Sequence, residues 1–251
     1  MIHRIRAEWL KTKHTWIPSM TFLLPFTFSL VLIGYFMTTA LTITAEYEAT
    51  SFLILFNLCV MIILGVFIDL ITDLDRKAGR YANEFRTDLN RKNYFLVKCL
   101  SIGSYLGLTY MIAGGTFYIG SYLRETQVPI NLFLLFLSIS YLLMLPNVLL
   151  VLFTSYQFRM NGAVINSAFL ALFGILIGTT GLGQEIWKYL PITWSIRMHY
   201  EYFPSQATGG TLLIKPLFGL TIIALLLIIC IFFIERIWYN QWEAEDGSKE
   251  G

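Results

Sequence analysis

Six long apolar blocks dominate the sequence, and none has a lysine or arginine in its interior. A helix needs about 20 predominantly apolar residues to cross the hydrocarbon core of a bilayer. Because lipid offers the backbone no hydrogen bonds, such segments cross as helices. The sequence therefore predicts an all-α, polytopic membrane protein with six transmembrane helices, over residues 17–41, 52–71, 99–122, 130–153, 163–182 and 212–234.

The composition supports a bilayer-embedded chain rather than a soluble domain. Of the 251 residues, 56% are hydrophobic and 14% are charged, whereas an ordinary globular chain has roughly 45–50% and about 25%. The formal net charge of +2 is too small to indicate binding to nucleic acid. We therefore expect membrane lipid, and no nucleic acid, as a partner.

The distribution of lysine and arginine predicts the orientation. With the N-terminus inside, the inner segments hold fourteen of the eighteen lysines and arginines. The outer segments hold only Arg124, Lys188, Arg197 and Lys215. Because cytoplasmic loops carry an excess of these residues, both termini are expected on the cytoplasmic side of a multi-pass protein in a bacterial cell membrane.

Residues 1–14 have the pattern of a short amphipathic helix on the inner membrane surface. Ile2, Ile5, Trp9 and Leu10 fall near one helical face, and basic residues lie toward the others. A basic helix with a tryptophan at its boundary is typical of the lipid–water interface. The alternative is an ordinary basic flank of the first transmembrane helix.

No motif for catalysis appears in the sequence. It lacks the G-x-x-x-x-G-K-[ST] loop that cradles phosphate, the H-E-x-x-H helix of zinc proteases and the G-x-S-x-G nucleophile elbow. His3, His14 and His199 are expected at surfaces, and the three cysteines lack the spacing of metal ligands. We therefore expect no enzyme activity, no metal site and no cofactor in this chain.

The predicted transmembrane helices carry few ionisable residues. Asp69 lies near the inner end of the second, with Asp73 one turn later. Both are expected to face an aqueous mouth or to pair with Arg76, Lys77 or Arg80. A proton-coupled secondary transporter needs more charge within its spans, so that class is disfavoured.

Small and polar residues within the spans predict helix contacts. Asn57, Asn147 and Asn166 favour hydrogen bonds between helices, the alternative being a substrate path that they line. Two glycine pairs at i, i+4 permit close backbone approach, either within this chain or against a second subunit. These are Gly103 with Gly107 and Gly174 with Gly178.

The inside loop, residues 72–98, mixes charged and apolar residues. Tyr81, Phe85 and Leu89 recur at helical spacing between the charges. A short helix with such a stripe suits a groove on another protein. It can equally lie on the membrane, with its basic residues against anionic lipid, and spacing alone leaves both readings open.

The outer segment, residues 183–211, gathers aromatic side chains on the side where a secreted peptide would arrive. The candidate substrate contacts are Trp187, Tyr189, Trp194 and Tyr200. The alternative is an aromatic belt at the headgroup level, with packing of short interfacial helices. A polar tail, residues 243–251, follows the last predicted span.

The chain resembles the permeases of ABC-2-type transporters, through its opening Ala7-Glu8-Trp9-Leu10-Lys11 and its loop from Asp75 to Lys98. It departs from the family at Leu89-Asn90, where a proline often precedes the arginine. The resemblance implies one membrane domain over residues 1–251 and a coupling helix that contacts a separate ATPase. The residues it implies for this coupling are Tyr81, Ala82, Glu84, Phe85, Arg86, Leu89 and Arg91.

More narrowly, the chain is similar to the MutE/EpiE group of lantibiotic-protection permeases, through its A-E-W-L-K start, its length and the Trp187-x-x-Leu190-Pro191 to Arg197 stretch. This similarity implies an exporter that expels a lantibiotic or similar amphipathic antimicrobial peptide. ATP and Mg²⁺ would bind the partner ATPase, beside a second, different permease. Two alternatives stay open: the same fold exporting a small-molecule drug or lipid-linked substrate, and a non-transporting membrane protein that sequesters or senses the peptide.

Overall fold

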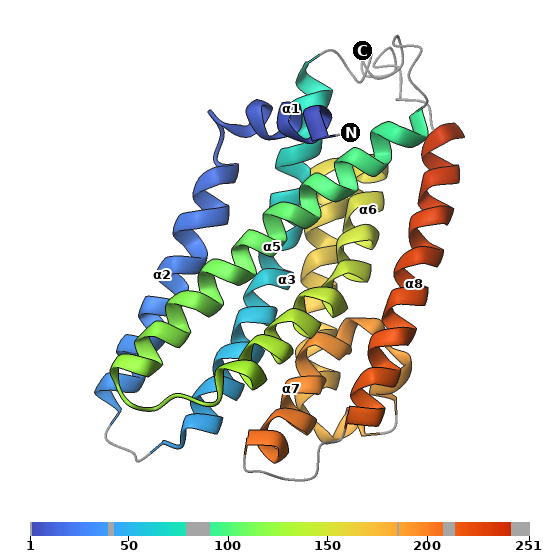
Figure 1. Ribbon diagram of the computed structural model, residues 1–251. Coiled ribbons are helices and arrows are strands. Elements are labelled where there is room, and N and C mark those ends of the chain that lie inside the picture. The colour runs from blue at the N-terminus through green and yellow to red at the C-terminus, as the bar shows by residue number, and fades with distance from the viewer. Residues whose placement is uncertain (1, 40–42, 79–90, 185, 208–213, 242–251) are drawn as a thin grey trace.

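The computed structural model describes residues 2–39, 43–78, 91–184, 186–207 and 214–241, and its regular elements are helices. Two 3₁₀ turns, η1 (Gly181–Gly183) and η2 (Trp187–Tyr189), lie between α6 and α7. The prediction of an all-α fold is confirmed. In chain order the α-helices are α1 (Ile2–Thr12), α2 (Ile17–Thr38), α3 (Ala45–Lys77), α5 (Arg91–Leu123), α6 (Ile130–Thr179), α7 (Pro191–Ala207) and α8 (Ile214–Gln241) (Figure 1).

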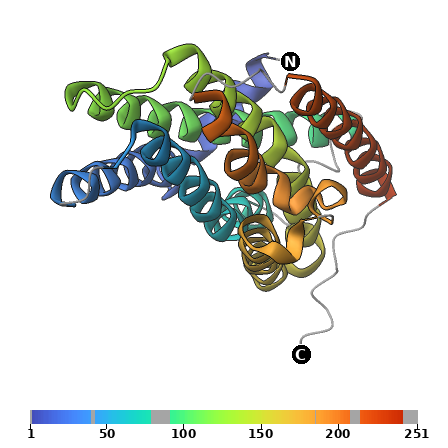
Figure 2. The ribbon, with the colours of Figure 1, turned by 90° about the horizontal axis from the view of Figure 1, so that it is seen from below.

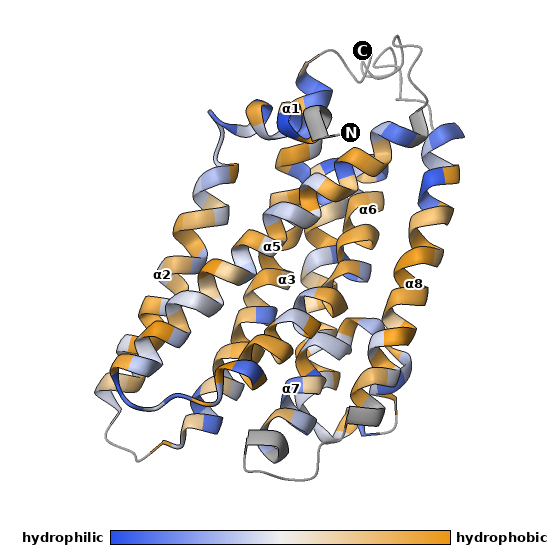
Figure 3. Cartoon of the chain, in the orientation of Figure 1, coloured by the Kyte–Doolittle hydropathy of each residue, from blue (hydrophilic) through white to orange (hydrophobic). Residues whose placement is uncertain are grey.

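Five of these helices, α2, α3, α5, α6 and α8, are long and apolar enough to cross a membrane. Hydrophobic residues fill their middle parts, and hydrophilic residues gather toward the ends of the bundle (Figure 3). Long apolar helices of this kind are typical of a multi-pass membrane protein, because every backbone polar group in lipid needs an internal partner.

Helix α3 continues to Lys77 and α5 begins at Arg91, so both ends of the predicted loop at residues 72–98 are helical. Lysine and arginine are good helix formers, so the basic residues at these ends allow both helices to continue. The two helices therefore do not stop where the apolar residues stop.

Helix α6 is long because it turns back on itself. Arg159 has a φ of 57° and a ψ of −155°, which lie outside the helical range. Beyond it, the Asn166 side-chain amide donates to the Leu150 carbonyl oxygen at 3.3 Å. In a straight helix these residues would be about 24 Å apart along the axis. The arm before Arg159 and the arm after it therefore lie side by side, and they carry the apolar blocks predicted at residues 130–153 and 163–182.

Helix α3 lies inside the bundle, whereas α2 and α8 lie toward opposite edges (Figure 2). Small polar side chains join α3 to both arms of α6. Where lipid removes the hydrophobic drive between helices, such hydrogen bonds and close packing hold them together. The bonds run from Asn57 Nδ2 to Ser140 Oγ (2.7 Å), from the Gly65 amide to Ser167 Oγ (2.9 Å) and between the hydroxyls of Thr72 and Ser155 (2.7 Å).

We expect Gly65→Ala to destabilise the bundle, because α3 and the second arm of α6 approach closely at this glycine. A Cβ at Gly65 would lie 2.4 Å from the Ala163 carbonyl oxygen and 2.8 Å from Ser167 Cβ. Overpacking costs about 1–3 kcal/mol, which lowers the Tm by roughly 2–12 °C in a chain of this size. Thermal unfolding of the detergent-solubilised protein measures the change.

The matched control is Gly115→Ala, since nothing lies within 4 Å of a Cβ at Gly115. This variant should keep or raise the Tm, because alanine is the better helix former. Equal Tm values for the two variants would contradict the packing described here.

Candidate functional site

Four charged side chains form a charge cluster at the end of the bundle that holds α1, and three of them are buried. The four are Glu8 and Lys11 of α1, Asp75 of α3 and Lys98 of α5. The Lys98 Nζ lies 2.8 Å from Glu8 Oε2 and also contacts Asp75. The Lys11 Nζ lies 2.8 Å from Asp75 Oδ1 and also contacts Glu8. Two cations thus balance two carboxylates, and the cluster is neutral overall.

Burial makes the three buried members of the charge cluster, Glu8, Asp75 and Lys98, depend on their partners. Lys98 is 1% exposed and Asp75 is 5% exposed. A buried charge that loses its partner costs several kcal/mol. For Lys11, burial lowers the pKa of the ammonium, but Asp75 and the hydrogen bonds to its neighbours outweigh this effect and raise that pKa above its ordinary value. Lys11 therefore stays charged at physiological pH.

Aromatic and hydroxyl contacts add to the attachment of α1. Trp9 stacks on Tyr105 of α5 with ring centroids 4.4 Å apart, and its Nε1–H donates to Ser104 Oγ at 3.2 Å. Thr12 hydrogen-bonds the Tyr105 hydroxyl. The predicted N-terminal helix is thus present, but Leu10, expected on its apolar face, is exposed. Successive residues point about 100° apart on a helix, so the side that holds Trp9 against α5 turns Leu10 outward.

Most of the predicted ATPase-coupling residues fall outside the described part of the chain. The helix that precedes them, α3, ends next to the charge cluster, and Lys98 of the cluster lies in the second turn of the helix that follows them, α5. Arg91 is the first residue of α5. The residues outside the described part are Tyr81, Ala82, Glu84, Phe85, Arg86 and Leu89.

The two aspartates toward the C-terminal end of α3 pair with basic residues, as predicted. Arg76 reaches Asp69 at 3.3 Å and Asp73 at 3.1 Å, and Lys77 Nζ lies 2.7 Å from Asp73. Asp69 is buried and also accepts a hydrogen bond from Ser155 at 3.0 Å. Its carboxylate therefore holds α3 to α6 and does not face an aqueous mouth.

The four aromatic candidates of the predicted outer segment divide by exposure. Trp187 and Trp194 are buried, and the Trp194 Nε1–H donates to the Lys188 carbonyl oxygen at 3.1 Å. Tyr189 and Tyr200 are 82% and 52% exposed. The tryptophans fix the fold of the segment, so the tyrosines are the accessible pair.

Helix α7 is folded into the bundle against α3 and α6. It brings His199 to a central polar cluster with Asn57, Tyr110 and Ser140, all of them buried. The Tyr110 hydroxyl donates to Asn57 Oδ1 at 2.6 Å, and His199 Nε2 lies 3.0 Å from Ser140 Oγ. The prediction that His199 lies at a surface is wrong, because α7 packs between helices instead of lying outside them.

The asparagine predictions have a mixed outcome. Asn57 bonds between helices, and Asn166 bonds between the two arms of α6. Asn147 instead donates to the Met144 sulfur within α6, and its Oδ1 is buried without a hydrogen-bond partner among the described residues.

The second predicted glycine pair faces α7. A Cβ at Gly174 would lie 3.3 Å from the side chain of Ile196 of α7, and a Cβ at Gly178 would lie 3.0 Å from it. The first pair, Gly103 and Gly107, faces Tyr141 of α6 at 3.5 Å and 3.7 Å. Both pairs thus lie against helices of this chain.

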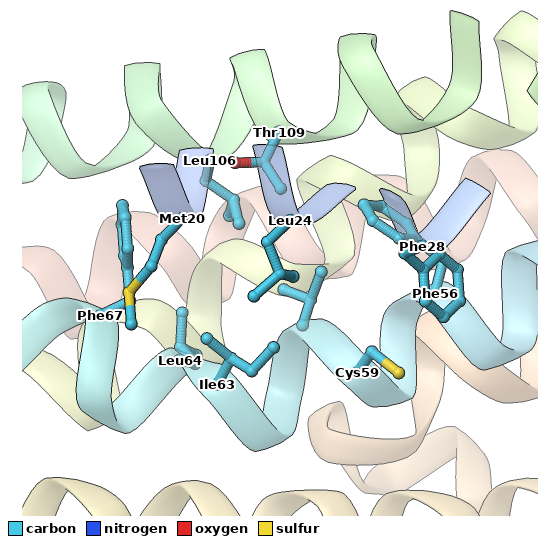
Figure 4. A pocket seen from close by; sticks show the side chains of 11 residues that line it. Met20, Leu24, Phe28, Phe56, Cys59, Ile63, Leu64, Phe67, Leu106 and Thr109 are labelled. Carbon is cyan, nitrogen blue, oxygen red and sulfur yellow. The ribbon is translucent and has the colours of Figure 1, made fainter. Parts of the chain in front are cut away.

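A small apolar cavity of about 40 Å³ lies between α2, α3 and α5 (Figure 4). Side chains such as Leu24, Phe56 and Leu64 surround it, and the Thr109 hydroxyl is on its wall. A space of this size admits a water molecule or two and is too small for a peptide. Among the described residues, no group of three or more His, Cys, Asp and Glu side chains is placed to hold a metal ion.

Sequence reasoning did not find the charge cluster, because its members lie far apart along the chain. One signal was present: Lys98 stands directly at the start of an apolar block, where a lysine needs either the interface or a carboxylate partner. Glu235, which is buried in α8, was also missed.

Comparison with known proteins identifies no relative, since no protein-family model, curated protein or solved structure matches the chain.

We expect Lys98→Met to destabilise the protein strongly, since it leaves Glu8 and Asp75 with one cation between them. Breaking a buried ion pair costs about 3–5 kcal/mol, or roughly 6–20 °C in Tm for a chain of this size. Thermal unfolding in detergent measures the loss. Lys77→Met is the control, because the Lys77 side chain is 79% exposed and its pair with Asp73 is superficial. If both variants unfold at the same temperature, the charge cluster does not constrain the fold.

Proposed function

We propose that this chain is the permease subunit of an ATP-driven exporter, and that a separate ATPase attaches at the end of the bundle that holds α1. The observation that carries the proposal is the charge cluster. It joins α1 to α3 and α5, the helices that flank residues 79–90. A movement imposed on that segment would therefore reach three helices together. Reaction chemistry, with ATP and Mg²⁺, belongs to the partner.

The proposed membrane topology has six passes. Helices α2, α3, α5 and α8 supply four, and the two arms of α6 supply the others. The arm over residues 160–179 spans about 30 Å at 1.5 Å per residue, which matches the hydrocarbon thickness of a bilayer. An even number of passes places both termini on one side, and the excess of lysine and arginine at that end favours the cytoplasm of a bacterial cell.

The proposed substrate is a lantibiotic or a similar amphipathic antimicrobial peptide, expelled for self-protection. This assignment rests on the sequence resemblance to lantibiotic-protection permeases, which also suggests a second, different permease as partner. Tyr189 and Tyr200 are accessible aromatic side chains for contact with a peptide. The alternative, export of a small-molecule drug, is favoured by one observation, an apolar groove between α5, α6 and α8.

Co-purification tests the proposal. A tagged chain expressed with its genomic neighbours should bring down an ATPase, and Phe85→Asp with Leu89→Asp should reduce the captured ATPase at least tenfold by placing two carboxylates in the coupling stripe. The control carries Leu182→Asp with Ile186→Asp, two exposed apolar residues at the other end of the bundle. It should capture as much ATPase as the unaltered chain.

Capture of no ATPase by the unaltered chain would refute the exporter proposal. Full capture and full protection by the Phe85/Leu89 variant would refute the attachment of the ATPase through this stripe. If the ATPase is captured but no amphipathic peptide stimulates its hydrolysis of ATP, the exporter proposal stands and the substrate assignment fails.

A further inference from the structure

A groove of about 530 Å³ runs between α5, α6 and α8. Its walls are mainly apolar, with Leu100 of α5, Leu149 of α6 and Phe232 of α8 among the side chains that line it. Ile229 and Phe233, also on its walls, are about half exposed, so the groove opens along α8. Volumes of roughly 300–1,000 Å³ are typical of sites for small organic ligands.

One buried carboxyl group lies on α8 just beyond the residues that line this groove. Glu235 is 5% exposed, and its Oε2 is buried with no hydrogen-bond partner among the described residues. It follows Ile228 and Phe232, which line the groove, at i+7 and i+3 on the same face of α8. It also lies close enough to Cys99, on the opposite wall, to act on that thiol electrostatically.

In the part of the chain that the structure describes, neither Arg236, next to Glu235 in the sequence, nor Lys98, next to Cys99, forms an ion pair with Glu235. Lys98 is bound by Glu8 and Asp75. The Arg236 guanidinium lies over the Phe232 ring at 5.9 Å. No ion pair found within the described ranges includes Glu235, although a buried carboxylate without a partner is costly. The groove therefore combines an apolar wall with an unmet demand for one cation or hydrogen-bond donor.

We propose that this groove binds a lipophilic amine, with the hydrocarbon part against the apolar walls and the ammonium group on Glu235. A role of this site in transport rests on the proposed function, because it presupposes that the chain is part of an exporter. An exporter of membrane-dissolved amphiphiles would hold the cationic, apolar part of its substrate at this place.

The occupant is an amphiphile without phosphate, rather than an aminophospholipid. The ammonium group of an aminophospholipid sits beside its own phosphate, which would be brought against the Glu235 carboxylate. Like charges placed together in a desolvated site cost several kcal/mol. A simple alkylamine meets the carboxylate with no such penalty.

Native mass spectrometry of the full chain, released from non-ionic detergent without any ATPase, tests this site. The probe is dodecylamine, and 1-dodecanol is the uncharged probe with the same chain. Glu235→Gln keeps the shape of the side chain but cannot ionise, and replacing an unpaired buried carboxyl group should leave the fold intact. Glu46→Gln, the same change in the first turn of α3 at the far end of the bundle, is the matched control.

The unaltered chain and Glu46→Gln should bind dodecylamine equally. Glu235→Gln should bind dodecylamine at least tenfold more weakly. All three chains should bind 1-dodecanol only weakly. Equal binding of dodecylamine to Glu235→Gln, or of 1-dodecanol and dodecylamine to the unaltered chain, would overturn the proposal and leave a groove for lipid hydrocarbon. Displacement of dodecylamine by dihexanoyl phosphatidylethanolamine would overturn the choice of occupant. Because the ATPase is absent, these outcomes are independent of the co-purification result.

Discussion

The pairing of Lys98 with Glu8 and Asp75 is the interaction on which the charged end of the bundle depends. Lys98 begins the apolar part of α5 and is almost fully buried. A lysine there needs carboxylates, because neither lipid nor an apolar core solvates an ammonium group. The carboxylates come from α1 and α3, so satisfying one side chain draws three helices together. Lys11 then balances the second negative charge and closes the cluster.

The middle of the bundle is held in a different way. Gly65 lets α3 approach the second arm of α6 closely, and serine, threonine and asparagine side chains join the two helices where they touch. Helix α7 packs against the same pair, with His199 hydrogen-bonded to Ser140. Charges therefore fix one end of the molecule, whereas small residues and neutral hydrogen bonds fix its centre. This division suits the proposed exporter, in which the charged end would receive the movement of the ATPase and the centre would lie in lipid.

Hydrophobic blocks are a one-dimensional signal, and they sufficed to predict an all-α fold with long apolar helices. The pairing of Asp69 and Asp73 with nearby basic residues was predictable as well, because partners three to seven residues apart share a helix face. The burial of His199 and Glu235 was not predictable. The type of a polar residue does not show whether its side chain faces a partner or water. For His199 and Glu235, only the packing of α7 and α8 shows that the side chains are buried.

The charge cluster around Lys98 was not predictable for the same reason. Lys98 and Glu8 lie far apart along the chain, and no sequence pattern relates them until α1 folds across α5. The turn at Arg159 was implied by two adjacent apolar blocks, but its backbone conformation was not. Residues 79–90, which bear most of the predicted ATPase contacts, lie outside the described structure, and their role rests on the sequence and on the geometry of the flanking helices.

The most direct test of the account is to determine which end of the bundle faces the cytoplasm. In a chain with serine in place of Cys59, Cys99 and Cys230, single cysteines would be introduced by Lys77→Cys and Tyr189→Cys, both at exposed positions. Intact cells would then be treated with a membrane-impermeant maleimide. The account predicts labelling of the Tyr189→Cys chain in intact cells and of the Lys77→Cys chain only after the membrane is opened. Labelling of the Lys77→Cys chain in intact cells would place the charge cluster outside, where no ATPase could reach it, and would contradict the account.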